Sequence, residues 1–173
     1  MTRVVVRRPK LSFRSVNVRG KPGYQPEMQR HHLLPQQLLA TAGLAQMLDH
    51  LGRGQVGFDD FRCNGLLLPA SEAAALRAGM PLHRGPHRQY NAMVAERVGQ
   101  IEQEWAQRVG RCPLVARRDA IFRLALLQRA LRRRLLDTAR GRLTLCSKDP
   151  IANQKDFSEL DALVDQLWPA TGF

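Results

Sequence analysis

The sequence predicts an α+β fold in which a small core with two short strands is followed by a mostly α-helical C-terminal extension. Two short segments stop at a proline, as strands bounded by turn residues do: residues 29–34, which look extended, and the apolar residues 65–69. After residue 89, apolar residues instead recur every three or four positions over long stretches, which is the period of a helix. A chain of 173 residues is one domain of ordinary size and can bury a sizeable core.

The first part of the chain is predicted to contain an arm, a helix and a hairpin. Residues 1–27 form a basic N-terminal arm, because prolines and glycines interrupt any sustained period, although "VVV" at its start could pair as an edge strand. A helix is expected over residues 35–50, with proline near its start and glycines after its end. The dipeptide Asn64-Gly65 then predicts a hairpin turn in front of the second strand.

The rest of the chain is predicted to be helical. Ser71 and Gly79 suit the N-cap and C-cap of a short helix. A helix of about five turns is expected from Tyr90 to Val109. A second long helix follows over about residues 117–140, with arginines opposite an apolar stripe of Ile121, Leu124, Leu127, Leu131 and Leu135. A last, acidic helix is expected after Pro150. The resulting boundaries are residues 28–105 for the core and 106–173 for the helical extension.

The charge of the chain is strongly positive and unevenly distributed. Of the net charge of +12, residues 1–30 and 101–145 carry +7 each, whereas residues 146–173 carry −3. Most of the surplus is arginine, whose planar guanidinium binds phosphate through two donors at once. The expected partner is therefore a polyanion, meaning nucleic acid. A solubilising surface or a patch for an acidic protein partner would produce the same charge.

Several classes of protein are not supported by the sequence. Its apolar runs are far shorter than a membrane span, and the N-terminus lacks the apolar region of a signal peptide. The three cysteines contain no CxxC pair, which argues against a disulfide framework or a zinc ribbon.

The histidines form the pattern that carries chemistry. His31 and His32 are adjacent at the end of the first predicted strand, and His83 and His87 are four apart before a helix. This order of strand, Asn-containing turn, strand and HxxxH is the layout of a ββα-metal site. Adjacent residues of a strand point in different directions, so one histidine of the doublet can face a metal while the other faces the substrate. His83 and His87 could share one helical face, although Pro86 favours placing His83 just before the helix. Three imidazoles leave a coordination position open, as catalytic metal sites do.

Three motifs resemble the AHH family of nuclease domains in the HNH/endonuclease VII (His-Me finger) superfamily, found in bacterial polymorphic toxins. They are "RHHLLP", "NGLLLP" and "LHRGPHRQYN", in the family's order, and the resemblance covers roughly residues 28–100. Arg30 stands where the family has Ala. The resemblance implies that His31, His83 and His87 hold one divalent ion, that His32 is the general base, and that Asn64 braces the loop and holds the His32 ring.

Arginines near these motifs are candidates for contacts with phosphates. The residues expected to bind nucleic acid are Arg30, Arg84, Arg88, Arg132 and Arg133. A solvated helix face would also explain Arg84 and Arg88, and the arginines of the second long helix could instead dock an acidic inhibitor. Asn64 could be only a turn residue, and Tyr90 fits core packing better than a substrate contact.

The leading functional prediction is a metal-dependent endonuclease that hydrolyses DNA, with RNA as the alternative substrate, and acts as an antibacterial toxin. The metal would be zinc, nickel, magnesium or manganese, and the partner a cognate acidic immunity protein. Such an effector would be made in the bacterial cytoplasm without a signal peptide and delivered by a specialised secretion system. The alternatives are a non-catalytic, metal-containing DNA-binding protein and a housekeeping or phage-type endonuclease of the same fold. His32 favours an enzyme, because the chelate does not need it.

Overall fold

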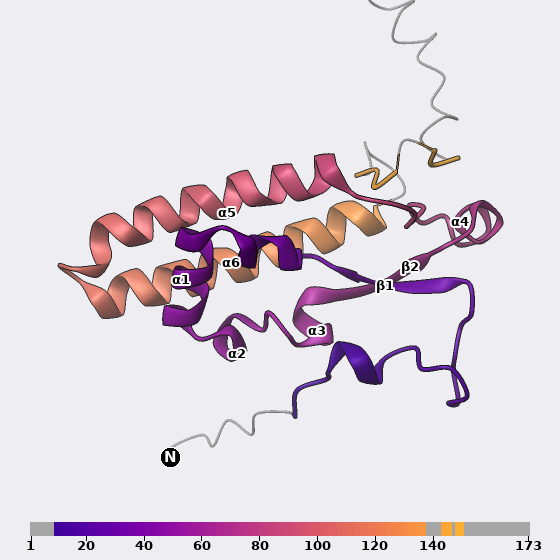
Figure 1. Ribbon diagram of the computed structural model, residues 1–173, viewed down its shortest axis with the longest axis horizontal. Coiled ribbons are helices and arrows are strands. Elements are labelled where there is room, and N and C mark those ends of the chain that lie inside the picture. Colours follow the sequence, from indigo (N-terminus) through magenta and orange to yellow (C-terminus); the bar gives the residue numbers. More distant parts are fainter. Residues whose placement is uncertain (1–8, 138–142, 147, 151–173) are drawn as a thin grey trace, which may run out of the picture.

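The computed structural model describes residues 9–137, 143–146 and 148–150, and it confirms the predicted fold class. A two-stranded antiparallel sheet lies near one end of a long pair of helices, and smaller helices flank it (Figure 1). In chain order the elements are the 3-10 helix η1 (Phe13–Ser15), β1 (Met28–His32), the 3-10 helix η2 (Gln36–Ala40), α1 (Ala42–Leu51), α2 (Arg53–Val56), α3 (Phe61–Asn64), β2 (Gly65–Pro69), α4 (Glu72–Ala78), α5 (Arg88–Val109) and α6 (Pro113–Leu136).

The two strands pair antiparallel, with His31 opposite Leu66 and His32 opposite Gly65. The connection between them runs from residue 33 to residue 64 and contains η2 and three short helices. The predicted hairpin turn at Asn64-Gly65 is therefore wrong. Asn64 ends α3 and Gly65 begins β2, and the Asn64 side chain bonds across the long connection instead of closing a local turn.

The predicted helices are present, with shifted boundaries. The stretch expected over residues 35–50 divides into η2 and α1, because Thr41 between them is extended. Around α4, Ser71 accepts a hydrogen bond from the backbone of Ala74, and Gly79 has a φ of 61°, so both predicted caps are confirmed. The second long helix begins at Pro113, earlier than expected, since proline suits the first helical position.

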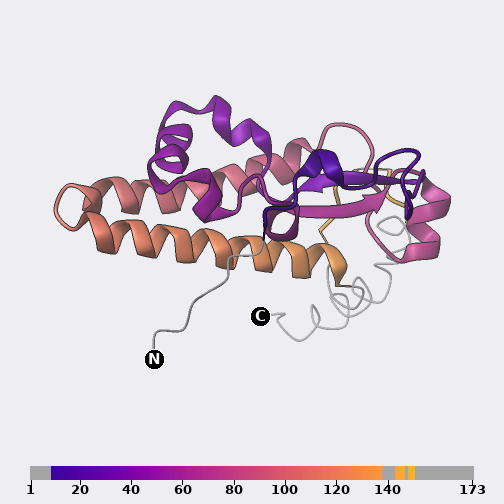
Figure 2. The same ribbon diagram turned by 90° about the horizontal axis from the view of Figure 1, so that it is seen from below.

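The two long helices pack side by side along their length in both views (Figures 1 and 2). The buried face of α5 is the predicted stripe, which consists of Tyr90, Val94, Val98, Ile101 and Trp105. The buried face of α6 differs from its predicted stripe and consists of Ala116, Ala120, Leu124, Gln128, Leu131 and Leu135. Of the predicted stripe, Leu124, Leu131 and Leu135 are buried. Ile121 and Leu127 are only half-buried, and their neighbours Ala120 and Gln128 are buried instead.

One hydrophobic cluster joins the strands to the helices. It contains Leu33 and Leu34 directly after β1, residues of α1, and the buried faces of α5 and α6. The boundary predicted after residue 105 falls inside α5, and residues on both sides of it belong to this cluster. Physically, α6 is thus part of the core that supports the histidine-bearing elements.

Residues 9–17 of the predicted arm lie against α3 and β1. Ser12 forms a β-bridge with Asp60, and the backbone of Phe61 donates to the carbonyl of Leu11 at 2.8 Å. The "VVV" segment and the last acidic helix lie outside the described residues. Among the helices that the structure describes, none has both the length and the apolar character needed to cross a membrane.

Candidate active site

The alternation of β1 divides the histidine doublet between two environments. Gln29 and His31 project to one face of the strand, where they meet His83. Arg30 and His32 project to the other face, where both contact Phe13. The strand thus places the two histidines of the doublet on opposite faces, as the alternation of a strand predicts.

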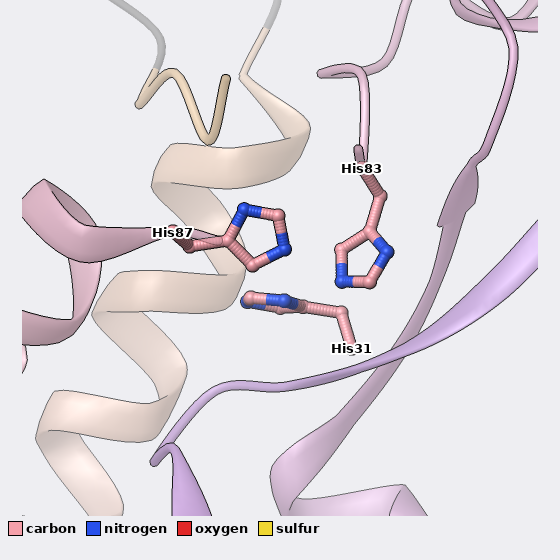
Figure 3. Close-up of side chains that lie close together, drawn as sticks. All are labelled: His31, His83 and His87. Carbon is pink, nitrogen blue, oxygen red and sulfur yellow. The ribbon is translucent and has the colours of Figure 1, made fainter. Parts of the chain in front are cut away.

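The structure brings His31, His83 and His87 together (Figure 3). One nitrogen from each ring lies within 4.8 Å of the others. The ring centroids are 5.1 Å apart for His31 and His83, 5.6 Å for His31 and His87, and 4.5 Å for His83 and His87. This cluster, here called the histidine triad, is the arrangement that the predicted metal site requires.

His83 and His87 do not share a helical face, contrary to one of the expectations. His87 is the N-cap of α5, and His83 lies in the preceding loop. Between them Gly85 has a φ of 76°, a conformation that side chains with a Cβ rarely adopt. A turn of the loop, instead of a turn of helix, therefore brings the two rings together.

Hydrogen bonds fix the tautomers of His83 and His87. Nδ1 of His83 lies 3.1 Å from Oε1 of Gln29, and Nδ1 of His87 lies 3.0 Å from the carbonyl oxygen of Leu145. Because these oxygens only accept, each Nδ1 carries the proton and donates. The Nε2 lone pair of both rings is then available to a metal ion, in the arrangement usual for metal-binding histidines.

The electrostatics of the triad favour neutral rings, which a metal ion needs. Burial is the main cause that lowers the pKa of His31 to about 2, and the neighbouring histidines contribute in the same direction. Burial is also the main cause that lowers the pKa of His83 to about 4, and the neighbouring His87 is the second. Nε2 of His31 is also buried without a hydrogen-bond partner among the described residues. A buried nitrogen of this kind is costly unless something binds it, so the residues fit a metal ion.

His32 stands outside the triad, in a half-exposed position. The ring of Phe13 is stacked on its face, with centroids 3.7 Å apart and planes 5° from parallel. Nε2 of His32 lies 3.4 Å from the side-chain nitrogen of Gln36. The pKa of His32 is lowered overall, and burial is the main cause. Arg30 lowers this pKa further, whereas Asp59 acts in the opposite direction. The ring is therefore kept neutral and able to accept a proton.

Asn64 is a fully buried brace, and not a turn residue. Its side-chain oxygen accepts from the backbone of Leu34 at 2.7 Å and from Gln128 at 3.3 Å. Its side-chain nitrogen donates to the carbonyls of Leu34 at 3.1 Å and Phe58 at 2.8 Å. These four bonds use the capacity of the amide. Asn64 thus holds the backbone after the doublet, and the expectation that it bonds the His32 ring is wrong.

The arginines expected to bind nucleic acid occupy different surroundings. Arg84 and Arg88 are exposed beside His83 and His87. Arg30 donates to the carbonyl of Phe13 at 2.8 Å, and Arg132 donates to the carbonyl of Arg62 at 2.8 Å, so both also support the fold. Arg133 is exposed near the end of α6. Tyr90 is buried and donates to the carbonyl of Leu33 at 2.8 Å, in agreement with core packing.

Sequence reasoning missed the residues that support the site from a distance. These are Phe13 beside His32, Gln29 beside His83, and Leu145 beside His87. Of these three, only Gln29 could have been predicted from the sequence, because it is two residues before His31 and therefore on the same face of β1. Phe13 and Leu145 reach the site through tertiary packing alone.

Residues 12–123 match the model of a family described as a nuclease family of the HNH/ENDO VII superfamily with conserved AHH. The match includes the doublet, Asn64, His83 and His87, together with Phe13. No curated protein and no solved structure matches the chain.

Proposed function

Because this chain belongs to the AHH nuclease family of the HNH/ENDO VII superfamily, we propose that it is a metal-dependent endonuclease that hydrolyses phosphodiester bonds of DNA. The observation that carries the proposal is the histidine triad, with a separate, neutral histidine on the next residue of the same strand. A structural metal site needs no such neighbour. The net charge of +12 supports a nucleic-acid substrate. We propose DNA, and RNA is the alternative because it presents the same phosphates.

In the proposed site His31, His83 and His87 hold the ion through their imidazole nitrogens. A divalent ion bound there would supply positive charge that stabilises the phosphate as negative charge develops on it. Gln29 and Leu145 keep the His83 and His87 rings in the tautomer that exposes Nε2. The donor set of three imidazoles suits zinc and nickel, and manganese and magnesium are the alternatives to test.

His32 is the proposed general base. It removes a proton from the attacking water while the water oxygen forms a bond to phosphorus and the bond to the leaving oxygen breaks. The lowered pKa of His32 keeps the ring unprotonated at neutral pH, which is the state that a base requires. Asn64 acts one step away, by fixing the backbone of Leu34 shortly after the doublet.

The biological role that we propose is an antibacterial toxin delivered to target cells by a specialised secretion system and restrained by an acidic immunity protein. The strongly positive chain supports an acidic inhibitor, because the attractive field would speed the association of the two proteins. Expression in a bacterial cytoplasm tests this role. The wild type should stop growth, and the His32→Ala variant should be tolerated. A wild type that is harmless at high level would contradict it.

Plasmid hydrolysis tests the enzymatic proposal. Purified protein should cut supercoiled plasmid, a chelator should abolish cutting, and added zinc, nickel, manganese or magnesium should restore it. His50→Ala is a matched control, because His50 lies at the end of α1 against Trp105 and outside the triad. Cutting that resists chelation, or that survives in His32→Ala as well as in His50→Ala, would refute this mechanism. DNA binding without any cutting would favour a non-catalytic binding protein.

A further inference from the structure

A pocket of about 460 Å³ opens beside the histidine triad. One wall is the loop before α5 with the first residues of that helix, including Arg84, Pro86 and Arg88. The other wall is the segment Thr144, Leu145, Cys146 and Lys148. The described lining does not include a triad histidine, but Pro86 and Arg88 flank His87 in the chain and the Leu145 carbonyl accepts the His87 hydrogen bond.

The lining of this pocket is cationic. Arg84, Arg88 and Lys148 contribute three positive charges, and none of the described lining residues is acidic. Arg84 has an exposed contact with Glu72 at 4.0 Å, the outer limit of an ion pair. An exposed pair at that distance offsets little of the charge. The field in the pocket therefore favours an anion.

We propose that this pocket binds a phosphate of the nucleic-acid strand, next to the phosphate that is cleaved at the triad. The inference rests on the proposed nuclease function and names a second contact with the same substrate. Successive phosphates on one strand advance by about 3.4 Å along the duplex axis. A cationic pocket that shares residues with the loop of His87 would therefore receive a phosphate close along the strand to the reacting one.

The second wall lies beyond the family match, which ends at residue 123. The carboxylate of Asp149, which is fully buried, anchors this wall by accepting from the backbone of Leu82, the residue before His83. Lys148 is held next to that anchor and remains exposed. The position of Lys148 is therefore set by the same loop that carries the metal ligands.

The test compares Lys148→Gln and Arg88→Gln with Arg111→Gln, which removes the same charge from the exposed turn between α5 and α6. Binding to a fluorescent DNA duplex is measured without metal, over a range of salt, and plasmid cleavage is measured with metal. Each pocket variant should weaken binding by about tenfold and reduce the salt slope by about one, and it should raise KM for cleavage more than it lowers kcat. If the two residues grip the same phosphate, the double variant should lose less than the product of the single effects.

Equal losses in Arg111→Gln would overturn the pocket and leave only a general effect of charge. Unchanged binding in both pocket variants would overturn it as well. The binding measurement also separates the two proposals. A wild type that binds DNA without cutting it, with weaker binding in Lys148→Gln, keeps the pocket and loses the nuclease. A wild type that cuts DNA, with binding unchanged in Lys148→Gln and Arg88→Gln, keeps the nuclease and loses the pocket.

A second inference comes from a different observation, the stack of Phe13 on His32. Phe13 is held in place by its neighbours on both sides. The Leu11 backbone donates to Asp60 at 3.3 Å, Ser12 bridges Asp60, and Arg30 donates to the Phe13 carbonyl at 2.8 Å. The Phe61 ring meets the Phe13 ring edge-on, with centroids 5.1 Å apart. We infer that Phe13 is a positioning residue that fixes the plane of the general base, an inference that rests on the proposed role of His32.

Glycine at position 65 is required for this aromatic stack. A Cβ on Gly65, which pairs with His32, would lie 2.2 Å from the Phe61 ring. Phe61 supports Phe13, and Phe13 covers one face of His32. The stack leaves the ring edge of His32, which carries its nitrogens, free to meet water and Gln36.

Replacement of Phe13 by Leu tests this role. Phe13→Leu should lower kcat by about 10- to 100-fold, since small misplacements of a reacting group are costly, with KM and zinc affinity unchanged. Phe13→Tyr should retain most of the rate. The ring protons of His32 should move downfield in the NMR spectrum of Phe13→Leu alone. Phe122→Leu, on the exposed face of α6, is the control. A normal kcat in Phe13→Leu, or an equal loss in Phe13→Tyr, would refute the inference.

Discussion

At the scale of single residues, the two adjacent histidines have separate surroundings because a strand alternates. His31 is buried against His83, His87 and Tyr90. His32 is half-exposed against Phe13 and Gln36. Adjacent positions can therefore serve the two proposed roles, metal ligand and general base, because their rings meet different neighbours.

The division of labour predicts opposite effects for the two alanine variants. His31→Ala should weaken zinc or nickel binding, because it removes one ligand of three. His32→Ala should leave metal and DNA binding almost unchanged and lower the cleavage rate by about 10²–10⁴-fold, as expected for loss of a general base. Calorimetry with the metal alone and plasmid cleavage measure the two effects. Loss of metal in His32→Ala with retention in His31→Ala would mean that the roles are reversed.

The lowered pKa values of the triad predict how the metal-free protein responds to acid. In the unfolded chain a histidine titrates near 6.5, whereas folding lowers the pKa of His31 to about 2 and that of His83 to about 4. Below pH 6.5 the unfolded chain thus binds more protons than the native one. The free energy of unfolding should be fully retained above about pH 6.5 and should decrease as the pH falls towards 4.

Urea unfolding of the metal-free protein at about pH 7.5, 6 and 5 measures this dependence. His83→Gln should show a flatter decrease, because its side chain cannot take up a proton in the unfolded state. If the free energy of unfolding decreased equally steeply in the wild type and in His83→Gln, the lowered pKa of His83 would not be a cause of the acid sensitivity.

At the scale of elements, the segment after α6 contributes to the site from outside the family match. Leu145 orients His87 through its carbonyl, and Asp149 ties the segment to Leu82. The segment that follows the second long helix thus supports the loop from residue 82 to residue 87, which carries two of the three triad histidines.

Asp149→Ala should therefore reduce zinc affinity by about 10- to 100-fold, the usual effect of removing a partner that supports a metal ligand. Asp149→Asn should retain more affinity, because its amide oxygen can still accept from Leu82. Asp119→Ala, which breaks a surface contact with Arg108, is the matched control and should bind zinc normally. Calorimetry decides, and unchanged affinity in Asp149→Ala would show that the segment is not needed at the site.

At the scale of the whole molecule, basic residues lie at both ends of the pair formed by α5 and α6. Arg132 and Arg133 lie near the end of α6, and Arg132 contacts the end of α3 just before β2. The α5–α6 turn, with Arg111, lies at the opposite end of the helix pair (Figure 1). Basic residues on the same helix pair thus lie at very different distances from the triad.

Affinity for unrelated DNA duplexes should consequently fall steeply with salt, since each neutralised phosphate releases counterions. Arg133→Glu should weaken binding to all sequences about equally and reduce the salt slope by about one or two, with Arg111→Glu as the more distant control. Binding isotherms at several salt concentrations measure the slope. A flat salt dependence would instead assign these arginines to a protein partner.

Features that depend on near neighbours in the chain could be predicted from the sequence alone. The helix period of residues 90–109, the caps at Ser71 and Gly79, and the opposite faces of His31 and His32 follow from local geometry. The composition of the triad also followed, because three motifs in a known order resemble one family. Local patterns carry this information because backbone periodicity and capping act within a few residues.

Features that join distant parts of the chain were decided only by the tertiary structure. The His87 tautomer depends on Leu145, and the plane of His32 depends on Phe13. Asn64 looked like a turn residue, but burial among Leu34, Phe58 and Gln128 makes it a brace of the core. Hydrogen-bonding groups excluded from water must find a partner wherever packing places one. Packing of the whole chain selects that partner, and no local period of the sequence records it.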